Sequence, residues 1–366
     1  MTRSSSGNSS PDASLTQDES FVGTSFRGLT YPLGRFAPEP GTLHELASGV
    51  RWARIRFPGS LGHINSWVLD DGAGVAICDT GVDIPLCRQD WEAILAGPLS
   101  GATVTRVIGT HFHPDHIGLA GWLSARDGAR VWMTRGEWLT AQLACADARD
   151  IVPEDVIAMR RAAGWSDEQI DVSRAEGWGR MRQMVSPLPI GFHRVQDGDV
   201  IAIGDAEWRV VTGCGHSPEH ACLVNDAQGL MISGDQVLPR ISSNVSLGAS
   251  EPEADPLGDW LASIDKLLGL SDDLLVLPAH GEPFRGLHTR LNALRREHEA
   301  RLDELADFME TPRRAVDCFT KLFRRVIDQS VLGLATGEAL SHLRHLEVTG
   351  RAVREVRDGV WWFQAA

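Results

Sequence analysis

The sequence predicts an α/β fold with two β-rich halves, a helical insertion between them and a small C-terminal domain. In the first half, runs of β-branched residues alternate with helical patterns, and a second series of strands begins near Val200. The stretch that joins the two halves has helical rather than strand spacing. With 366 residues and 43% hydrophobic content, the chain can bury a sizeable core.

The strands of the first half are expected over residues 50–57 and 66–69. The turn Asp70-Asp-Gly-Ala-Gly leads into a further strand that ends at Asp79. The composition of residues 103–109 predicts a buried strand, and the pattern of residues 117–124 predicts a helix. The second half is expected to contain strands over residues 200–203, 207–212, 221–225 and 230–233.

The loop after residues 103–109 reads Thr110-His-Phe-His-Pro-Asp-His, which places His111, His113, Asp115 and His116 within six residues. A single histidine is more often a core or surface residue than a ligand. Four such groups would crowd like charges without compensation unless they bind metal. A His-x-His pair can hold one cation, while Asp115 and His116 emerge one step later. The spacing therefore favours two metal ions over one.

This run resembles the signature of the metallo-beta-lactamase fold superfamily, and the resemblance covers about residues 45–290. It implies an αββα sandwich with the metals at the sheet edge. By resemblance, Asp79 orients a ligand histidine without touching metal, although alone it reads as a turn residue. The resemblance also implies a first metal on His111, His113 and His216, a second metal on Asp115, His116 and His280, and a bridging carboxylate from Asp235.

Imidazole and carboxylate ligands without a thiolate suit zinc, manganese or iron. The diiron branch of the superfamily has Glu in place of His113, and beta-lactamases with a Cys ligand have it in place of Asp235. Both differences favour a dizinc hydrolase, with two Zn²⁺ expected and Mn²⁺ or Fe²⁺ as alternatives. Cys214 is expected to be a small packing residue. His220 is expected to be structural, with a position facing the cleft as the alternative.

Two such cations would lower the pKa of a shared water to about 7, so that hydroxide serves as the nucleophile. The second metal would polarise the scissile carbonyl or phosphoryl oxygen. Asp115 and Asp235 are both candidates to relay the proton, and the sequence does not choose between them.

A formal net charge of −14 opposes nucleic-acid binding, which needs clustered Lys and Arg, so the expected partner is a small-molecule substrate. Residues 1–20 are serine-rich, lack the apolar region of a signal peptide and are expected to be disordered. No apolar stretch reaches the roughly 18 residues of a membrane span. Six cysteines without CxxC spacing fit a reducing compartment. We expect a cytoplasmic protein without membrane contact.

The insertion, about residues 135–195, is expected to form a helical lid. It carries eight large apolar residues that either line a substrate pocket or only pack the lid to the body, and both alternatives stay open. These residues are Trp138, Leu143, Ile157, Met159, Trp165, Trp178, Met181 and Met184.

The catalytic domain is expected over residues 21–310, ending in an amphipathic helix over residues 287–309, and the C-terminal domain over residues 311–366. In the latter we expect helices over residues 313–328 and 336–348 and a hairpin of residues 352–356 and 360–363. The pattern resembles the winged-helix tail of one superfamily branch, which contains endoribonucleases, glyoxalase II-like hydrolases and polyketide thioesterases. Nine Lys or Arg against six Asp or Glu favour a packing cap or homodimer contact over DNA binding.

The leading interpretation is hydrolysis of an acyl bond, in a thioester, lactone or activated ester, of a substrate with an apolar part. Phosphodiester cleavage of RNA is the alternative, which the tail supports and the net charge opposes. Lactonases of the family use a pocket Tyr, but the one tyrosine here, Tyr31, precedes the region of resemblance. Beta-lactam hydrolysis is disfavoured because an export signal is missing. A non-catalytic metal-binding scaffold is disfavoured because all seven ligand positions are retained.

Overall fold

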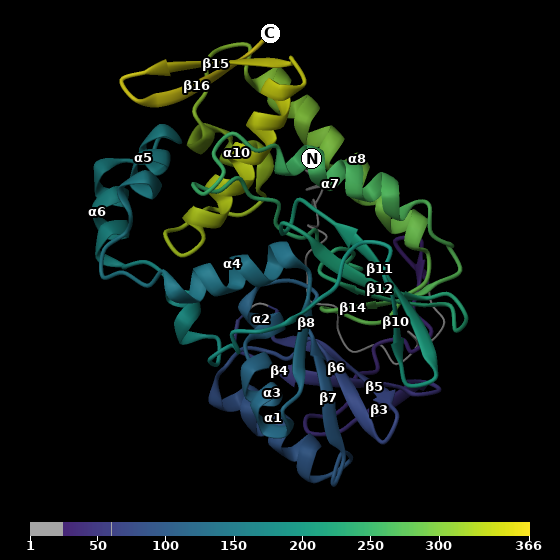
Figure 1. Ribbon diagram of the computed structural model, residues 1–366. Coiled ribbons are helices and arrows are strands. Elements are labelled where there is room, and N and C mark those ends of the chain that lie inside the picture. The colour runs from purple at the N-terminus through teal and green to yellow at the C-terminus, as the bar shows by residue number, and fades with distance from the viewer. Residues whose placement is uncertain (1–24, 60) are drawn as a thin grey trace, which may run out of the picture.

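Two β-sheets pack face to face in the computed structural model, which describes residues 25–59 and 61–366 (Figure 1). The disordered leader expected over residues 1–20 lies outside the described residues. Among the described residues, the larger sheet has the strand order β3 (His44–Ala47), β4 (Val50–Arg56), β5 (His63–Asp71), β6 (Gly74–Cys78), β7 (Thr103–Ile108), β8 (Arg130–Met133) and β9 (His193–Arg194). The smaller sheet has the order β10 (Val200–Ile203), β11 (Ala206–Gly213), β12 (His220–Asn225), β13 (Leu230–Gly234) and β14 (Leu275–Pro278).

Alternation along the strands divides the side chains between the layers. In β5, Trp67 and Leu69 face the smaller sheet, whereas Val68 points to the helices on the other side. In β12, Leu223 joins the core between the sheets and Val224 joins the outer core. Because the side-chain period of a strand is two, both faces of each sheet are covered by apolar residues, and the expected αββα sandwich is confirmed.

The outer faces of the two sheets are covered by different helices. The larger sheet packs against α1 (Pro85–Ala96), the short α2 (Pro114–Ile117) and α3 (Ala120–Asp127). The smaller sheet packs against α7 (Pro256–Leu267) and the long α8 (Leu287–Phe308). In the described part of the chain, no helix combines the length and apolarity that a bilayer span needs.

The insertion is helical, as expected. It contains α4 (Arg135–Ala146), α5 (Glu154–Ala162), α6 (Asp167–Ala175) and a 3₁₀ turn, η2 (Arg180–Gln183). Ser166 and Gln169 form a reciprocal capping box at the start of α6. The short strands β3, β8 and β9 were not predicted from the sequence, because two to four residues are too few to show the alternation of a strand.

The C-terminal part follows the expected order of helices and hairpin, with one correction. The helix expected over residues 313–328 is replaced by a 3₁₀ turn, η3 (Ala315–Cys318), and by α9 (Phe319–Leu322), which stops at the extended Phe323. The β-branched Val326 and Ile327 that follow are weak helix formers. The chain continues with α10 (Leu332–Val348), β15 (Ala352–Arg357) and β16 (Val360–Ala365).

The hairpin turn is the one that its sequence predicts. Asp358 and Gly359 both have positive φ, of 50° and 79°, which is the type I′ geometry that Asp-Gly favours. At the amino end of the described residues, a small ribbon of β1 (Ser25–Phe26) and β2 (Leu29–Thr30) is followed by Tyr31, whose buried ring contacts Phe284.

The turns that carry the candidate ligands all lie at one edge of the sandwich. Strands β6 and β7 are parallel, and so are β13 and β14, while β11 runs in the same direction as β13 because both are antiparallel to β12. The carboxyl ends of these five strands lead into Asp79, His111, His216, Asp235 and His280. The fold thereby brings distant segments of the chain to one place.

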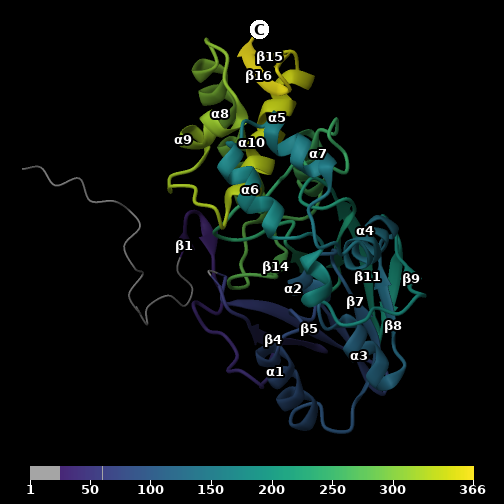
Figure 2. The ribbon, with the colours of Figure 1, turned by 90° about the vertical axis from the view of Figure 1, so that its left-hand side faces the viewer.

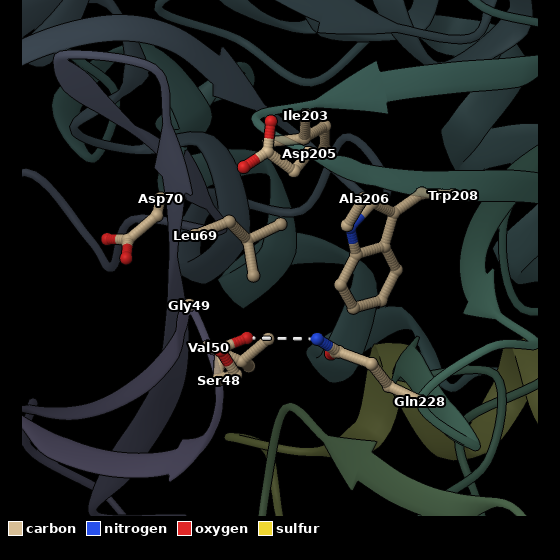
Figure 3. A pocket seen from close by; sticks show the side chains of 10 residues that line it. All are labelled: Ser48, Gly49, Val50, Leu69, Asp70, Ile203, Asp205, Ala206, Trp208 and Gln228. Atoms are coloured by element: carbon tan, nitrogen blue, oxygen red, sulfur yellow. Dashed lines mark hydrogen bonds between the residues drawn. The ribbon is translucent and has the colours of Figure 1, made fainter.

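A polar cavity of about 200 Å³ lies between the sheets at the opposite edge (Figure 3). Leu69 near the carboxyl end of β5, Ile203 at the end of β10 and Trp208 near the start of β11 face it, and Gln228 Nε2 donates to the Ser48 carbonyl across it at 3.0 Å. Because β5 is antiparallel to β6, this edge is remote from the candidate ligands.

Candidate metal centre

The structure brings the seven predicted ligand residues together. Their ligand atoms fall into three overlapping groups, and within each group these atoms lie within 4.8 Å of one another. The groups are His111, His113 and His216; His111, His116 and Asp235; and Asp115, His116 and His280.

The first group consists of three imidazoles. His111 Nε2 lies 2.7 Å from His113 Nδ1 and 3.2 Å from His216 Nε2, so the three ring nitrogens converge on one point. His113 immediately precedes α2, where the following Pro114 occupies the first helical position. The loop thus ends abruptly in a helix, and Asp115 and His116 project from its first turn.

The second group lies beside the first. His280 Nε2 is 3.2 Å from Asp115 Oδ2, and His116 Nε2 is 3.7 Å from the same oxygen. Asp235 lies between the groups, because its Oδ1 is 3.5 Å from both His116 Nε2 and His280 Nε2 while its Oδ2 is 3.6 Å from His216 Nε2. One carboxylate therefore faces both sets of nitrogens.

Unsatisfied polar atoms in this cluster fit a cation site. Among the described residues, His116 Nε2, His280 Nε2 and Asp235 Oδ1 are buried without a hydrogen bond of normal geometry. Leaving such atoms unpaired costs roughly 1–3 kcal/mol each, which a bound cation would offset. All three belong to the convergent groups, so the donor set fits divalent metal ions.

The outer ring nitrogens are held by backbone carbonyls. His216 Nδ1 donates to the Asn244 carbonyl at 2.8 Å, and His280 Nδ1 donates to the His63 carbonyl at 2.7 Å. Each bond engages Nδ1 and leaves Nε2 as the ring nitrogen that faces the cluster. The two rings are therefore preset to present Nε2 to the cluster.

Electrostatics keeps the first group neutral. Burial lowers the pKa of His111 well below its usual value, and the neighbouring His116 and His113 lower it further. Burial, with a contribution from His216, lowers the pKa of His113 to about 3. Neutral imidazoles keep the lone pair that metal binding requires.

Asp79 connects two parts of the cluster without joining a ligand group. Its Oδ2 accepts from His116 Nδ1 at 2.8 Å, and its Oδ1 accepts from the Thr110 backbone N–H at 2.9 Å. The residue has φ of 60°, a conformation that non-glycine residues rarely adopt and that is enriched at functional sites. Asp79 thereby orients His116 and holds the start of the ligand loop.

Glu137 is a buried residue of the site that sequence reasoning missed. It lies in the first turn of α4, and its carboxylate accepts from the Phe112 N–H at 2.9 Å, the Ser217 hydroxyl at 2.7 Å and the Glu219 N–H at 2.7 Å. Burial raises the pKa of Glu137 to about 7, against these three bonds that favour its charged form. The available signal was an acidic residue near the start of a segment with helical spacing, just before Trp138.

Glu137 joins the two loops that hold the first group. Phe112 stands between His111 and His113, and Ser217 follows His216 directly. One carboxylate therefore fixes both loops against each other, although they are about 100 residues apart in the sequence.

His220 is buried, as a structural role requires, whereas Cys214 is half-buried rather than buried. His220 Nε2 accepts from the Asp235 N–H at 3.1 Å, and its fully buried ring stacks on that of His111 with centroids 4.8 Å apart. Cys214 lies outside the ligand groups found among the described residues, and its N–H donates to Ser263 Oγ at 2.7 Å.

The structure places the eight apolar residues of the insertion in different environments. Three of them line a surface groove, namely Met159, Trp165 and Trp178. Four are buried in the core clusters, namely Trp138, Ile157, Met181 and Trp165, the last of which also lines the groove. Met184 is half-buried, and Leu143 is exposed on α4. Ile157 and Trp165 in addition pack into the core shared with α10.

Known proteins match both parts of the chain. The family model described as "Metallo-beta-lactamase superfamily" matches residues 59–280, more than half of the chain, and one described as "Metallo-beta-lactamase-like, C-terminal domain" matches residues 302–366. A crystal structure of a beta-lactamase domain protein from Burkholderia ambifaria is 42% identical, with a TM-score of 0.85, and the match covers 92% of this chain and 98% of that chain.

Two curated relatives are named as thioesterases. Over 254 residues the chain is 28% identical to acyl-coenzyme A thioesterase MBLAC2 of Gallus gallus, a match that covers 65% of this chain and 80% of the relative. Over 308 residues it is 23% identical to an atrochrysone carboxyl ACP thioesterase of Emericella nidulans, which covers 82% of this chain and 79% of the relative.

Proposed function

Because the chain belongs to the metallo-beta-lactamase superfamily and is a metal-dependent hydrolase, we propose that it cleaves the acyl bond of a thioester whose acyl part is apolar. The observation that carries the proposal is the pair of ligand groups that share Asp235 at the sheet edge. The thioesterase names of the two relatives favour a thioester over a lactone or an activated ester.

The proposed centre holds two divalent cations, with Zn²⁺ as the expected metal and Mn²⁺ or Fe²⁺ as alternatives. His111, His113 and His216 would hold the first, Asp115, His116 and His280 the second, and Asp235 would serve both. When bound, such a pair lowers the pKa of water to about 7 and polarises the scissile carbonyl. A nucleophilic serine or cysteine is then not required.

The chain's own residues would position groups and move the proton. Asp79 orients His116 through a 2.8 Å hydrogen bond. Asp115 and Asp235 face the space between the groups, and either carboxylate can accept the proton that water loses on attack. The side chain of Asp115 is 17% exposed and that of Asp235 is 11% exposed, so Asp115 is better placed to pass the proton to a leaving thiolate.

A comparison of substrates tests the proposal. The protein, loaded with zinc or separately with manganese, would be assayed on a medium-chain acyl thioester, an aromatic ester or lactone, and bis(p-nitrophenyl) phosphate. We expect thioester cleavage to exceed phosphodiester cleavage by at least 100-fold in kcat/KM. Dominant phosphodiester cleavage would overturn the proposal in favour of the nuclease alternative.

Substitution of a ligand links the activity to the metal. We expect Asp235→Asn and His111→Ala to lose bound metal and thioester cleavage together, because each removes an atom that faces the cluster. His288→Ala, a change at a half-buried histidine on α8 away from the groups, should keep both. Retention of full activity in the ligand variants would contradict the assignment.

A further inference from the structure

An apolar groove of about 260 Å³ runs between the insertion and the C-terminal helix α10. In both ribbon views, α5 and α6 lie beside α10 (Figure 1 and Figure 2). The groove is lined from the insertion by Val156, Met159, Arg160, Trp165 and Trp178, from the loop of residues 246–249, and from α10 by Gly333, Leu334, Thr336, Gly337 and Leu340.

The loop of residues 246–249, which lines this groove, lies close in the chain to a residue that contacts a candidate metal ligand. Asn244, two residues before Ser246, accepts from His216 Nδ1 through its carbonyl at 2.8 Å. Two residues of extended chain span about 7 Å at most. Ser246 at the groove therefore lies within about 12 Å of the outer ring nitrogen of His216, a distance that an acyl thioester can span.

The walls of the groove are tied together. Trp165 Nε1 donates to Thr336 Oγ1 at 2.9 Å, which joins the insertion to α10. The Leu247 N–H donates to the Gly337 carbonyl at 3.0 Å, and a Cβ on Gly337 would come within 2.7 Å of Ser246 Oγ. Glycine at this position lets the loop approach α10 closely, so the groove is largely preformed.

The lining suits a hydrocarbon better than a phosphate or nucleotide. Among the described residues that line the groove, Arg160 is the one with a charged side chain, and its guanidinium lies 4.9 Å from the centroid of the Trp165 ring and bonds to Ser173. The guanidinium of Arg160 thus already has partners within the protein. Met159, Trp178 and Leu334 supply accessible apolar surface, and covering it with a hydrocarbon chain lowers the free energy.

The size of the groove sets the length of the occupant. At about 30 Å³ for a water-sized group, 260 Å³ accommodates about nine non-hydrogen atoms. We propose, on the basis of the thioesterase function above, that this groove binds the acyl chain of the substrate and selects chains of about eight to ten carbons.

A chain-length series tests this inference. Initial rates would be measured on straight-chain acyl thioesters of two to sixteen carbons that share one thiol. We expect kcat/KM to rise at least tenfold from two to eight carbons and to level off near ten, because further carbons extend beyond the groove.

A blocking variant locates the effect. A Cβ at Gly333 meets no atom within 4 Å, so the backbone leaves room for Gly333→Phe to add a ring at the groove. It should lower kcat/KM for the ten-carbon thioester at least tenfold and leave the two-carbon thioester unchanged. Val348→Phe, at an exposed position on the same helix outside the groove, is the control. Met159→Trp is a second blocking variant.

The outcomes separate the two proposals. Equal turnover of two-carbon and ten-carbon thioesters by the unmodified protein, or an unchanged chain-length profile in both blocking variants, would overturn the groove assignment and leave the thioesterase function standing. Absence of turnover for every thioester would remove the proposed function and the groove assignment with it.

Discussion

At the scale of single residues, buried carboxylates outside the ligand groups determine where the ligands stand. Asp79 is 1% exposed and Glu137 is fully buried, and each accepts hydrogen bonds from the loops that carry the histidines. Burying a carboxylate is costly unless its oxygens are hydrogen-bonded. Both carboxylates meet this condition through hydrogen bonds from the ligand loops. The bonds that offset the cost of burying them therefore also keep the ligand loops in place.

Replacement of Glu137 tests this link. In Glu137→Gln, the amide NH₂ cannot accept the hydrogen bonds that one carboxylate oxygen accepts now. Loss of such an outer partner typically lowers metal affinity or activity by about 10–100-fold, and we expect a decrease in this range. Zinc affinity would be measured by competition with a chelator.

Glu219→Gln is the matched control for Glu137→Gln. The Glu219 carboxylate accepts from the Gly136 N–H at 2.8 Å, so it joins the His216 loop to the start of α4 but does not join the two ligand loops to each other. We expect the zinc affinity of Glu219→Gln to stay within about threefold of that of the unmodified protein. This change is small compared with the decrease expected for Glu137→Gln. Equal zinc affinity in both variants would refute a positioning role for Glu137.

At the scale of elements, the ends of the strands are shaped by tight contacts between turns. Gly234 ends β13 with φ of +50°, directly before Asp235. A Cβ there would lie 2.5 Å from His220 Nε2 and 2.8 Å from Thr110 Oγ1. The turn that delivers the shared carboxylate therefore requires glycine for space as well as for backbone conformation.

Gly234→Ala should reduce stability by more than the backbone effect alone. Overpacking typically costs about 1–3 kcal/mol, and positive φ adds about 1 kcal/mol. Gly229→Ala is the control, because Gly229 precedes β13 with φ of +65° and a Cβ added there would meet no atom within 4 Å. Urea unfolding with a chelator present would measure both variants. Equal destabilisation of the two variants would mean that the contact between the added Cβ and His220 does not lower stability.

At the scale of the whole molecule, the C-terminal helix α10 is held against α8 by a pair of buried histidines. His342 Nδ1 donates to the Glu338 carbonyl at 2.8 Å, so its Nε2 accepts from His298 Nδ1 at 3.1 Å. Burial, with contributions from the neighbouring His342, Arg301 and His345, lowers the pKa of His298 to about 3. Burial also lowers the pKa of His342 to about 4, although the Glu338 carbonyl opposes the shift.

Acid should therefore weaken this packing. In the unfolded chain a histidine titrates near pH 6.5, so below that pH the unfolded state binds protons that the folded pair does not. Stability is complete above about pH 6.5 and decreases as the pH falls toward the folded values of about 3 and 4. At pH 5 the loss is on the order of 2 kcal/mol for each histidine.

His298→Asn isolates this contribution, because the amide retains a donor near the position of Nδ1 but does not titrate. Urea unfolding at pH 7 and pH 5, with a chelator present, should show a decrease in stability that is smaller in the variant by about 2 kcal/mol. His288→Asn, at the other end of α8, should keep the pH dependence of the unmodified protein. An unchanged pH dependence in His298→Asn would show that the pair does not titrate as described.

Much of the fold was predictable because its signals are local. The strands around Val68 and Val107 and the helix that begins at Leu287 follow patterns of period two and of helical spacing, which need no knowledge of distant residues. The helix expected over residues 313–328 was wrong, because the extended backbone at Phe323 ends it where the sequence carries no strong stop signal.

The sequence by itself determined which residues can bind metal, because the seven imidazole and carboxylate groups and their spacing can be read from it directly. Only the tertiary structure decided which atoms meet and that Asp235 faces both groups. It also decided that Glu137 ties two loops together and that four apolar residues of the insertion line a groove with α10. The physical reason is that donor chemistry belongs to each residue, whereas burial, distance and a free lone pair arise from segments that meet only when the sheets pack.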